Sequence, residues 1–171
     1  VFKRCSASWI EDQDFWRFSG IFRDVELTAY PAAHLSDLFV HADMDGSFSA
    51  ECKLDLPEEA GTLEAVLTDA NGSALLTISQ PAQAEMTIEG SVADVNLWSA
   101  EIPYLYTLQI TLRGENVYEV SRTRVGFRRF EMKDGLMLIN GKRIVFRGVN
   151  RHDFSSLSGR VPNREELVQD I

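Results

Sequence analysis

Cysteine, histidine and proline are scarce in this chain, and long apolar runs are absent. Only 2 cysteines, 3 histidines and 5 prolines occur among 171 residues. Cys5 and Cys52 lack zinc-type spacing, which excludes a cysteine-based zinc site. We expect free thiols in a cytoplasmic protein, and a Cys5–Cys52 disulfide is the alternative. No apolar run reaches the roughly 18 residues of a membrane-spanning helix, so no membrane partner is expected.

Basic residues are outnumbered, with 17 Lys and Arg against 26 Asp and Glu and a formal net charge of −9. This balance disfavours a nucleic-acid partner, because phosphate binding needs clustered positive charge. The 44% hydrophobic and 25% charged content is typical of a soluble globular chain of one or two domains. The sequence begins with neither an initiator methionine nor an apolar run of signal-peptide length, so we expect residues to be missing upstream.

Short strands dominate the pattern between residues 33 and 128. The stretch 48–56 alternates, and it places Phe48, Ala50, Cys52, Leu54 and Leu56 on one face. Asn71-Gly72 between two apolar runs predicts a hairpin. Further strands are predicted over 38–44, 84–95, 105–114 and 117–127, and a weaker one over 22–30. About seven strands with turn signals every 8–12 residues predict an immunoglobulin-like β-sandwich.

Both flanks differ from this sandwich. Residues 1–32 carry a dense set of aromatic side chains. Because aromatic side chains bury large areas, we expect this segment to pack against a partner surface. In the second flank, Asp134-Gly135 and Asn140-Gly141 predict hairpin turns. An apolar strand over 144–146 then leads into "RGVNRHDF", and Asn163 with Glu166 predicts the capped start of a helix. A strand, a loop and an opening helix are the first part of a β/α unit, whose neighbours would come from the rest of the same chain.

Four stretches together resemble the β-galactosidases of glycoside hydrolase family 2. They are "SWIEDQDFWRFSGIFRDVEL", "LWSAEIPYLYTL", "VGFRRFEMKDGLMLINGKRIVFRGVNRHDF" and "VQDI". The similarity covers both flanks and the late strands of the sandwich, whereas residues 33–90 match only in pattern. Chained in this order, the motifs are specific for the family.

The resemblance implies a mainly β chain of three parts. Residues 1–32 resemble the tail of a jelly-roll sugar-binding domain, and residues 33–128 the immunoglobulin-like β-sandwich. Residues 129–171 resemble the linker hairpin and the first β/α unit of a truncated TIM barrel. The resemblance thus implies an internal fragment of a retaining glycosidase, whose expected reaction is the hydrolysis of terminal β-D-galactosides such as lactose. Both catalytic glutamates of this family lie on later barrel strands, so no residue here is assigned as catalytic and the fragment is expected to be inactive.

Two positions match residues that touch sugar in the family. His152 resembles a histidine that hydrogen-bonds the galactosyl ring at the mouth of the barrel, where the carboxyl ends of barrel strands gather. The alternative is a structural histidine bonded to backbone. Asp14 resembles an aspartate that binds a sodium ion and the galactose 6-hydroxyl in the full enzyme, and the alternative is a solvated acidic loop. The family also implies Mg²⁺ for the parent enzyme, through ligands outside this sequence.

Other roles and other functions stay open at this stage. Arg147, Asn150 and Arg151 are expected to brace strand ends, and Trp98 is expected in the sandwich core rather than as a sugar-stacking platform. The resemblance implies a homo-oligomeric parent whose other partner is its galactoside substrate. A free-standing carbohydrate-binding module is one alternative function. A fragment of a β-glucuronidase or a β-mannosidase is the other.

Overall fold

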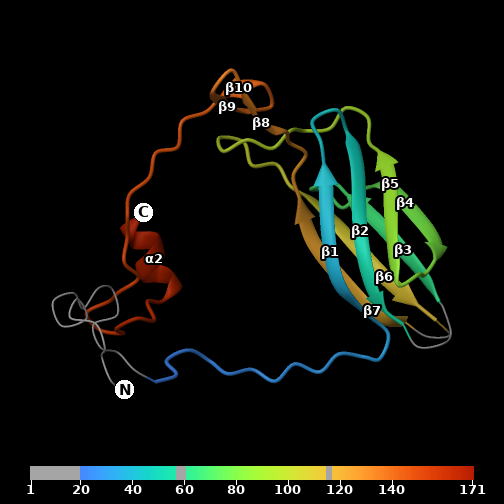
Figure 1. Cartoon of the computed structure of the whole chain (residues 1–171), viewed down its shortest axis with the longest axis horizontal. Coiled ribbons are helices and arrows are strands. Elements are labelled where there is room, and N and C mark those ends of the chain that lie inside the picture. Colours follow the sequence, from blue (N-terminus) through green and yellow to red (C-terminus); the bar gives the residue numbers. More distant parts are fainter. Residues whose placement is uncertain (1–19, 57–60, 115–116) are drawn as a thin grey trace. The chain divides into compact units, whose positions relative to one another are not determined.

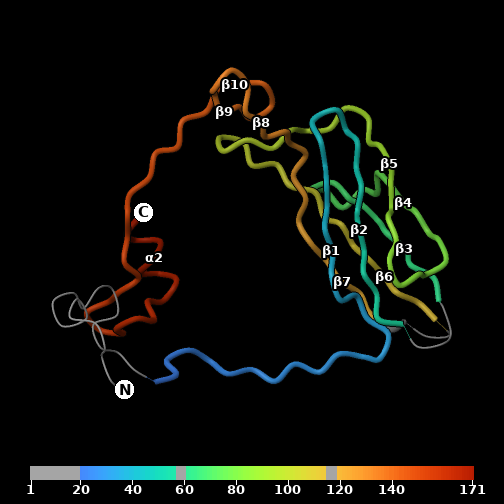
Figure 2. The backbone as a smooth tube through the Cα atoms, viewed as in Figure 1, coloured from blue at the N-terminus to red at the C-terminus, as the bar shows by residue number. Residues whose placement is uncertain are grey.

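The computed structural model describes residues 20–56, 61–114 and 117–171, and within them the chain forms two compact units. The larger unit is Ala29–Phe146 and contains all the described strands (Figure 1). The smaller unit combines Arg147–Ile171 with the N-terminal segment, of which residues 20–28 are described. The backbone tube in Figure 2 follows the same course through both units.

The larger unit is a two-layered antiparallel β-sandwich with a small hairpin sheet. One sheet has the strand order β1-β2-β5 and the other β4-β3-β6-β7. The strands are β1 His34–Ala42, β2 Ser47–Asp55, β3 Thr62–Thr68, β4 Ala74–Pro81, β5 Glu85–Ser91, β6 Tyr106–Arg113 and β7 Val117–Val125. This arrangement confirms the predicted mainly β sandwich of seven short strands.

Alternating side chains from both sheets fill the core. In β2, Phe48, Ala50, Cys52 and Leu54 are buried as predicted, and Leu56 packs against them. The facing sheet contributes a matching set from its central strands, namely Leu63, Ala65, Leu67, Tyr106, Leu108, Ile110 and Leu112. Phe127 is completely buried, and its ring meets Tyr106 edge to face at 5.1 Å between centroids. Because each strand has one apolar face, the two sheets bury these faces against each other.

At one edge of the sandwich a hydrogen bond links the two sheets. β1 and β7 are both edge strands, each on a different sheet. The Glu119 carboxylate of β7 accepts a hydrogen bond from the Leu35 N–H of β1 at 2.6 Å. The carboxylate thus satisfies the Leu35 N–H, which on an edge strand has no neighbouring strand to accept its hydrogen bond.

The predicted hairpin turns all form. Strands β8 Phe130–Lys133, β9 Leu136–Ile139 and β10 Lys142–Arg143 make the third sheet, in the order β10-β9-β8. Asp134-Gly135 and Asn140-Gly141 have positive φ at both positions, 51° and 75° in the first and 51° and 74° in the second. Type I′ turns require this backbone and favour Asp-Gly and Asn-Gly. The Asn71-Gly72 loop instead closes through Asp69, whose carboxylate accepts from the N–H groups of Asn71 and Ser73.

The hairpin is attached to the sandwich by a set of contacts that we call the clasp, formed by Asp43, Trp98, Arg129 and Asn140. The Arg129 guanidinium donates to both carboxylate oxygens of Asp43, with Nε–Oδ1 2.9 Å and Nη2–Oδ2 2.7 Å. The Asn140 amide donates to the Trp98 carbonyl at 3.0 Å and accepts from the Arg129 N–H at 2.9 Å. A two-pronged Arg–carboxylate pair fixes orientation as well as distance.

Two predicted strands are wrong. Residues 22–30 and residues 144–146 have no strand structure. A strand needs a paired neighbour for its backbone groups, and none of the described strands pairs with either segment. One bond, from the Ile144 N–H to the Met137 carbonyl at 2.9 Å, extends the hairpin ladder briefly.

The predicted helix forms as α2, Arg164–Asp170, with the complete capping box at its start. The Asn163 side chain accepts from the Glu166 N–H at 2.9 Å, and Glu166 accepts from the Asn163 N–H at 2.8 Å. The β/α unit is therefore present as its loop and helix. None of the helices in the described ranges is long and apolar enough to cross a bilayer.

Candidate functional site

His152 lies in the loop between residues 147 and 154, in the smaller unit, and its side chain is exposed. The loop has no regular secondary structure, so its position depends on side-chain contacts. The residues on both sides of His152 provide such contacts. The sugar-contacting role of His152 stays a prediction.

Arg151 braces this loop and not the end of a strand, because the strand predicted over 144–146 does not form. Its guanidinium donates to Asp153 at 3.1 Å and also contacts Asp170 near the end of α2. One arginine thus ties the two sides of His152 to the helix. The partners lie 2 and 19 residues away. The sequence predicted bracing at a strand end and gave no signal for Asp170 as the partner.

A second group of contacts orders the loop before the helix. The Glu166 carboxylate accepts from the Ser155 hydroxyl at 2.6 Å, in addition to its capping-box bond to Asn163. The Ser155 hydroxyl first, and then the Asn163 backbone, hold the pKa of Glu166 below its usual range. The Glu166 carboxylate therefore stays ionised and holds the loop to the start of the helix.

Within the smaller unit, the N-terminal segment also contacts the segment Arg147–Ile171. The Arg160 guanidinium lies over the Phe22 ring at 5.0 Å from its centroid. A cleft of about 520 Å³ next to this pair is lined by Phe22, Asp153, Pro162 and Leu167, among others. Asp14, the predicted sodium and sugar ligand, lies outside the described residues. Within the described ranges, no group of three or more His, Cys, Asp or Glu side chains could hold a metal ion.

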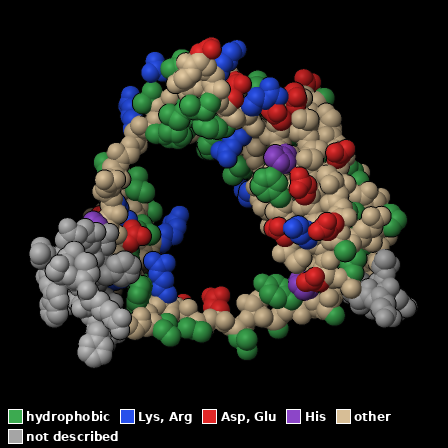
Figure 3. All heavy atoms as spheres, viewed as in Figure 1, with side chains coloured by type: hydrophobic (Ala, Val, Ile, Leu, Met, Phe, Trp, Pro, Cys, Tyr) green, Lys and Arg blue, Asp and Glu red, His purple; other side chains and the backbone are tan. Residues whose placement is uncertain are grey.

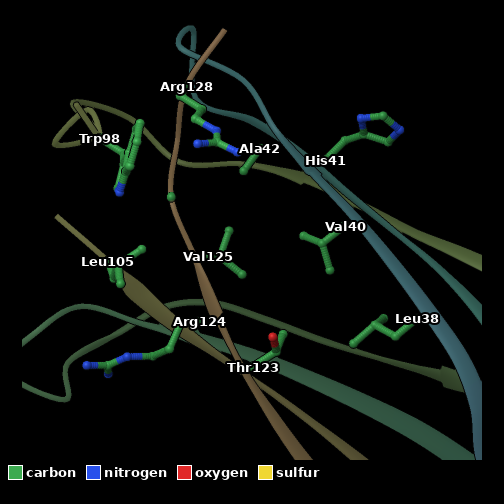
Figure 4. Close-up of a pocket in the computed structure, with 11 residues that line it drawn as sticks. Leu38, Val40, His41, Ala42, Trp98, Leu105, Thr123, Arg124, Val125 and Arg128 are labelled. Carbon is green, nitrogen blue, oxygen red and sulfur yellow. The ribbon is translucent and has the colours of Figure 1, made fainter. Parts of the chain in front are cut away.

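A groove of about 540 Å³ opens on the sandwich between β1 and β7 (Figure 4). Its apolar lining comes from inward-facing residues such as Val40 and Val125, and its polar lining includes His41, Arg124 and Arg128. A retaining glycosidase needs two carboxyl groups about 5–5.5 Å apart. No carboxylate is among the residues that line this groove. The groove therefore lacks the pair of carboxyl groups that glycoside cleavage requires.

Trp98 stands at one end of this groove and is half-buried, outside the core where it was predicted. The Arg128 guanidinium lies over its ring at 4.6 Å from the centroid. The ring also lies against Gly126, where an added Cβ would come within 3.0 Å of its Cβ and Cγ atoms. A tryptophan covered in this way by protein atoms is a poor stacking platform for sugar, which disfavours the free-standing binding module.

The order of these parts, an antiparallel sandwich, a hairpin, a loop and a capped helix, agrees with two matches to one family of glycosidases. Residues 33–128 match the family described as "Glycosyl hydrolases family 2" and residues 130–171 match "Glycosyl hydrolases family 2, TIM barrel domain". The chain belongs to glycosyl hydrolase family 2. The last 42 residues are thus the opening of its barrel domain, from residue 130 to residue 171.

The chain is similar in sequence to curated β-galactosidases. The "Beta-galactosidase" of Clostridium acetobutylicum is 46% identical over 179 residues, and that of Streptococcus thermophilus is 44% identical over 180. Each alignment covers 100% of this chain, but only 20% and 17% of the two relatives. The chain therefore spans about a fifth of the length of the curated relatives it matches.

Similar solved structures share the fold at lower identity. A β-glucuronidase of Bifidobacterium dentium, complexed with coumarin-3-O-glucuronide, has a TM-score of 0.70 at 21% identity and covers 82% of this chain and 25% of its own. The Faecalibacterium prausnitzii β-glucuronidase has a TM-score of 0.65 at 27% identity, covering 81% and 22%. These likenesses support the sandwich fold and leave the sugar specificity to other observations.

Proposed function

We propose that the protein containing these residues is a retaining β-galactosidase that hydrolyses terminal β-D-galactosides such as lactose. The observation that carries the proposal is the 46% identity to a β-galactosidase across 100% of this chain. The β-glucuronidase structures are only 21% and 27% identical. A galactosidase therefore fits better than the alternative glucuronidase. The reaction would use two carboxyl groups of the barrel, one as nucleophile and one as acid/base.

Residues 1–171 would serve this reaction without performing it. The sandwich would space and orient the sugar-binding domain and the barrel, and its groove holds no pair of carboxylates for the chemistry. His152 would hydrogen-bond the galactosyl ring and Asp14 would share a sodium ion with it. From the resemblance to the family we also propose that the full-length protein binds sodium and Mg²⁺. On the same ground it would be a homo-oligomer in the cytoplasm.

The test is hydrolysis by the full-length protein of nitrophenyl β-galactoside, β-glucuronide and β-mannoside. We expect kcat/KM to be highest for the galactoside, with the anomeric configuration retained when the product is followed by NMR. Residues 1–171 alone should release no nitrophenol. A higher kcat/KM for the glucuronide would overturn the assignment of galactose as the substrate.

The role of His152 is tested in the same protein. If the imidazole bonds the sugar more strongly in the transition state, His152→Ala lowers kcat more than it raises KM. His41→Ala is the matched control, because His41 is an exposed histidine on the sandwich. Equal losses in binding and in turnover would argue against a transition-state role for His152.

A further inference from the structure

His152 lies on a stretch of backbone that no helix or strand holds in place. Residues 147–154 have no regular secondary structure, and a loop without a hydrogen-bonded ladder is mobile unless side-chain contacts fix it. A group that acts on a substrate has to be held within about 1 Å of its working position. The loop therefore needs an anchor close to His152.

Arg151 supplies such an anchor on both sides of His152. The Nη1 atom of its guanidinium lies 3.1 Å from Oδ1 of Asp153, and Nη2 contacts Oδ2 of Asp170. Acidic and basic side chains both show on the surface of this smaller unit (Figure 3). A guanidinium is a flat, rigid fork, so two carboxylates on two of its nitrogens fix its direction as well as its distance.

The helix α2 gives this anchor a fixed base. Asp170 is the last residue of α2, and the first turn of the helix is held by its capping box. The Ser155 hydroxyl also donates to Glu166 at 2.6 Å. The helix is thus joined to the preceding chain near its start through Glu166 and at its end through Asp170.

The charges at the end of α2 favour the same pairing. None of the residues in its last turn is basic, and Asp170 puts a negative charge at the negative end of the helix dipole. Arg151 compensates this charge from 19 residues away. The side chains of Arg151 and Asp170 are 31% and 53% exposed. Ion pairs of such exposure add little to the stability of a whole fold, so the effect of this pair is local, on the His152 loop.

We propose that Arg151 is a positioning residue for His152, which acts by holding the loop against α2 and does not itself contact the sugar. The inference rests on the proposed function in one respect, namely that His152 contacts the substrate of the full-length protein. Asp153 and Asp170, both bound to Arg151, would fix the backbone on both sides of the imidazole. The imidazole would thereby keep its direction toward the glycosyl ring while the transition state forms.

The experiment is a double-mutant cycle in the full-length protein, with Arg151→Met, His152→Ala and the variant that has both changes. The substrate is whichever nitrophenyl glycoside the wild-type protein cleaves fastest. We expect Arg151→Met to lower kcat/KM about tenfold, chiefly through kcat, because a misplaced imidazole loses its transition-state contact. In the His152→Ala background the same change should lower kcat/KM by less than about twofold, since no imidazole is left to position.

Two further variants separate the fork from the charge and from the helix. Lysine keeps the positive charge but cannot hold two carboxylates in fixed directions, so Arg151→Lys should lose about threefold in kcat/KM. Arg164 is the matched control, because it is an exposed arginine at the start of the same helix. Arg164→Met should leave kcat/KM unchanged.

Equal losses for Arg151→Met with and without His152 would overturn the proposal, because Arg151 would then act apart from the imidazole. So would a loss of kcat/KM that a smaller folded fraction, measured by circular dichroism, fully accounts for. The proposed function fails in a different way. A wild-type protein that cleaves the glucuronide fastest would refute galactose as the substrate, and the cycle on that glucuronide would still decide the role of Arg151.

Discussion

Replacing Asn140 with alanine should destabilise the closed hairpin far more than the same replacement of Asp134, which has the same φ at the other turn. Asn140 lies at φ 51° and makes two side-chain hydrogen bonds, to the Trp98 carbonyl and from the Arg129 N–H. Asn140→Ala loses both bonds, at about 1 kcal/mol each. It also puts alanine in the left-handed region, at about 1 kcal/mol. The total is about 3 kcal/mol against the closed hairpin.

Asp134 is the matched control, because it has the same φ of 51° at the other turn of the hairpin. None of the hydrogen bonds found in the described ranges uses its side chain, so Asp134→Ala carries only the backbone cost of about 1 kcal/mol. Asn140→Gly removes the backbone cost and keeps the loss of the two bonds, at about 2 kcal/mol.

The assay is amide hydrogen exchange of β8 and β9 in residues 1–171, with the core strand β6 as internal reference. A free-energy loss of 1.4 kcal/mol corresponds to about tenfold. We expect protection to fall about 150-fold in Asn140→Ala, about 30-fold in Asn140→Gly and about fivefold in Asp134→Ala. Equal protection in the two alanine variants would refute the reasoning, since the bonds of the clasp would then contribute nothing.

Two further predictions concern titratable groups. Burial raises the pKa of the Cys52 thiol from 9.0 to about 11. In a Cys5→Ser chain, Cys52 should therefore alkylate at pH 8 about 100-fold more slowly than a peptide thiol. Mass spectrometry measures the alkylation rate, and a rate equal to that of a peptide thiol would contradict the prediction. The Glu166 pKa is lowered from 4.5, chiefly by the Ser155 hydroxyl. The stability that Glu166 contributes is thus present above pH 4.5 and lost as the pH falls through its folded pKa. The protection factors of the α2 amides, which are corrected for the pH dependence of intrinsic exchange, should fall in acid in the wild type but not in Glu166→Gln. Parallel pH profiles of the two proteins would count against this.

Features written into consecutive residues were predictable. Alternation in β2 predicted the buried face that carries Phe48 and Cys52, because a pleated strand repeats every two residues. Asp-Gly and Asn-Gly predicted turns whose positive φ those residues tolerate. The capping box at Asn163 is equally local, since both bonds join residues three positions apart.

Features that join distant residues were not predictable from these patterns. Arg129 and Asp43 are 86 residues apart, and no local signal pairs them. The same holds for Arg151 and Asp170, 19 residues apart. Trp98 was expected in the core because it is large and apolar, but Arg128 holds its ring at the sandwich end. The predicted strand over 144–146 failed because a strand is a property of a pair, and one segment cannot indicate its partner.

The clasp also determines where this protein can be divided into pieces. By sequence the barrel domain begins at residue 130, whereas the compact unit that holds the sandwich runs to Phe146. A truncation after Arg128 would strip Asp43 of its arginine and leave the Trp98 carbonyl without its amide donor. A truncation after Phe146 keeps both. The boundary of the family match at residue 130 therefore differs from the boundary of the compact unit at Phe146. Gene fusions and domain exchanges should be made after Phe146.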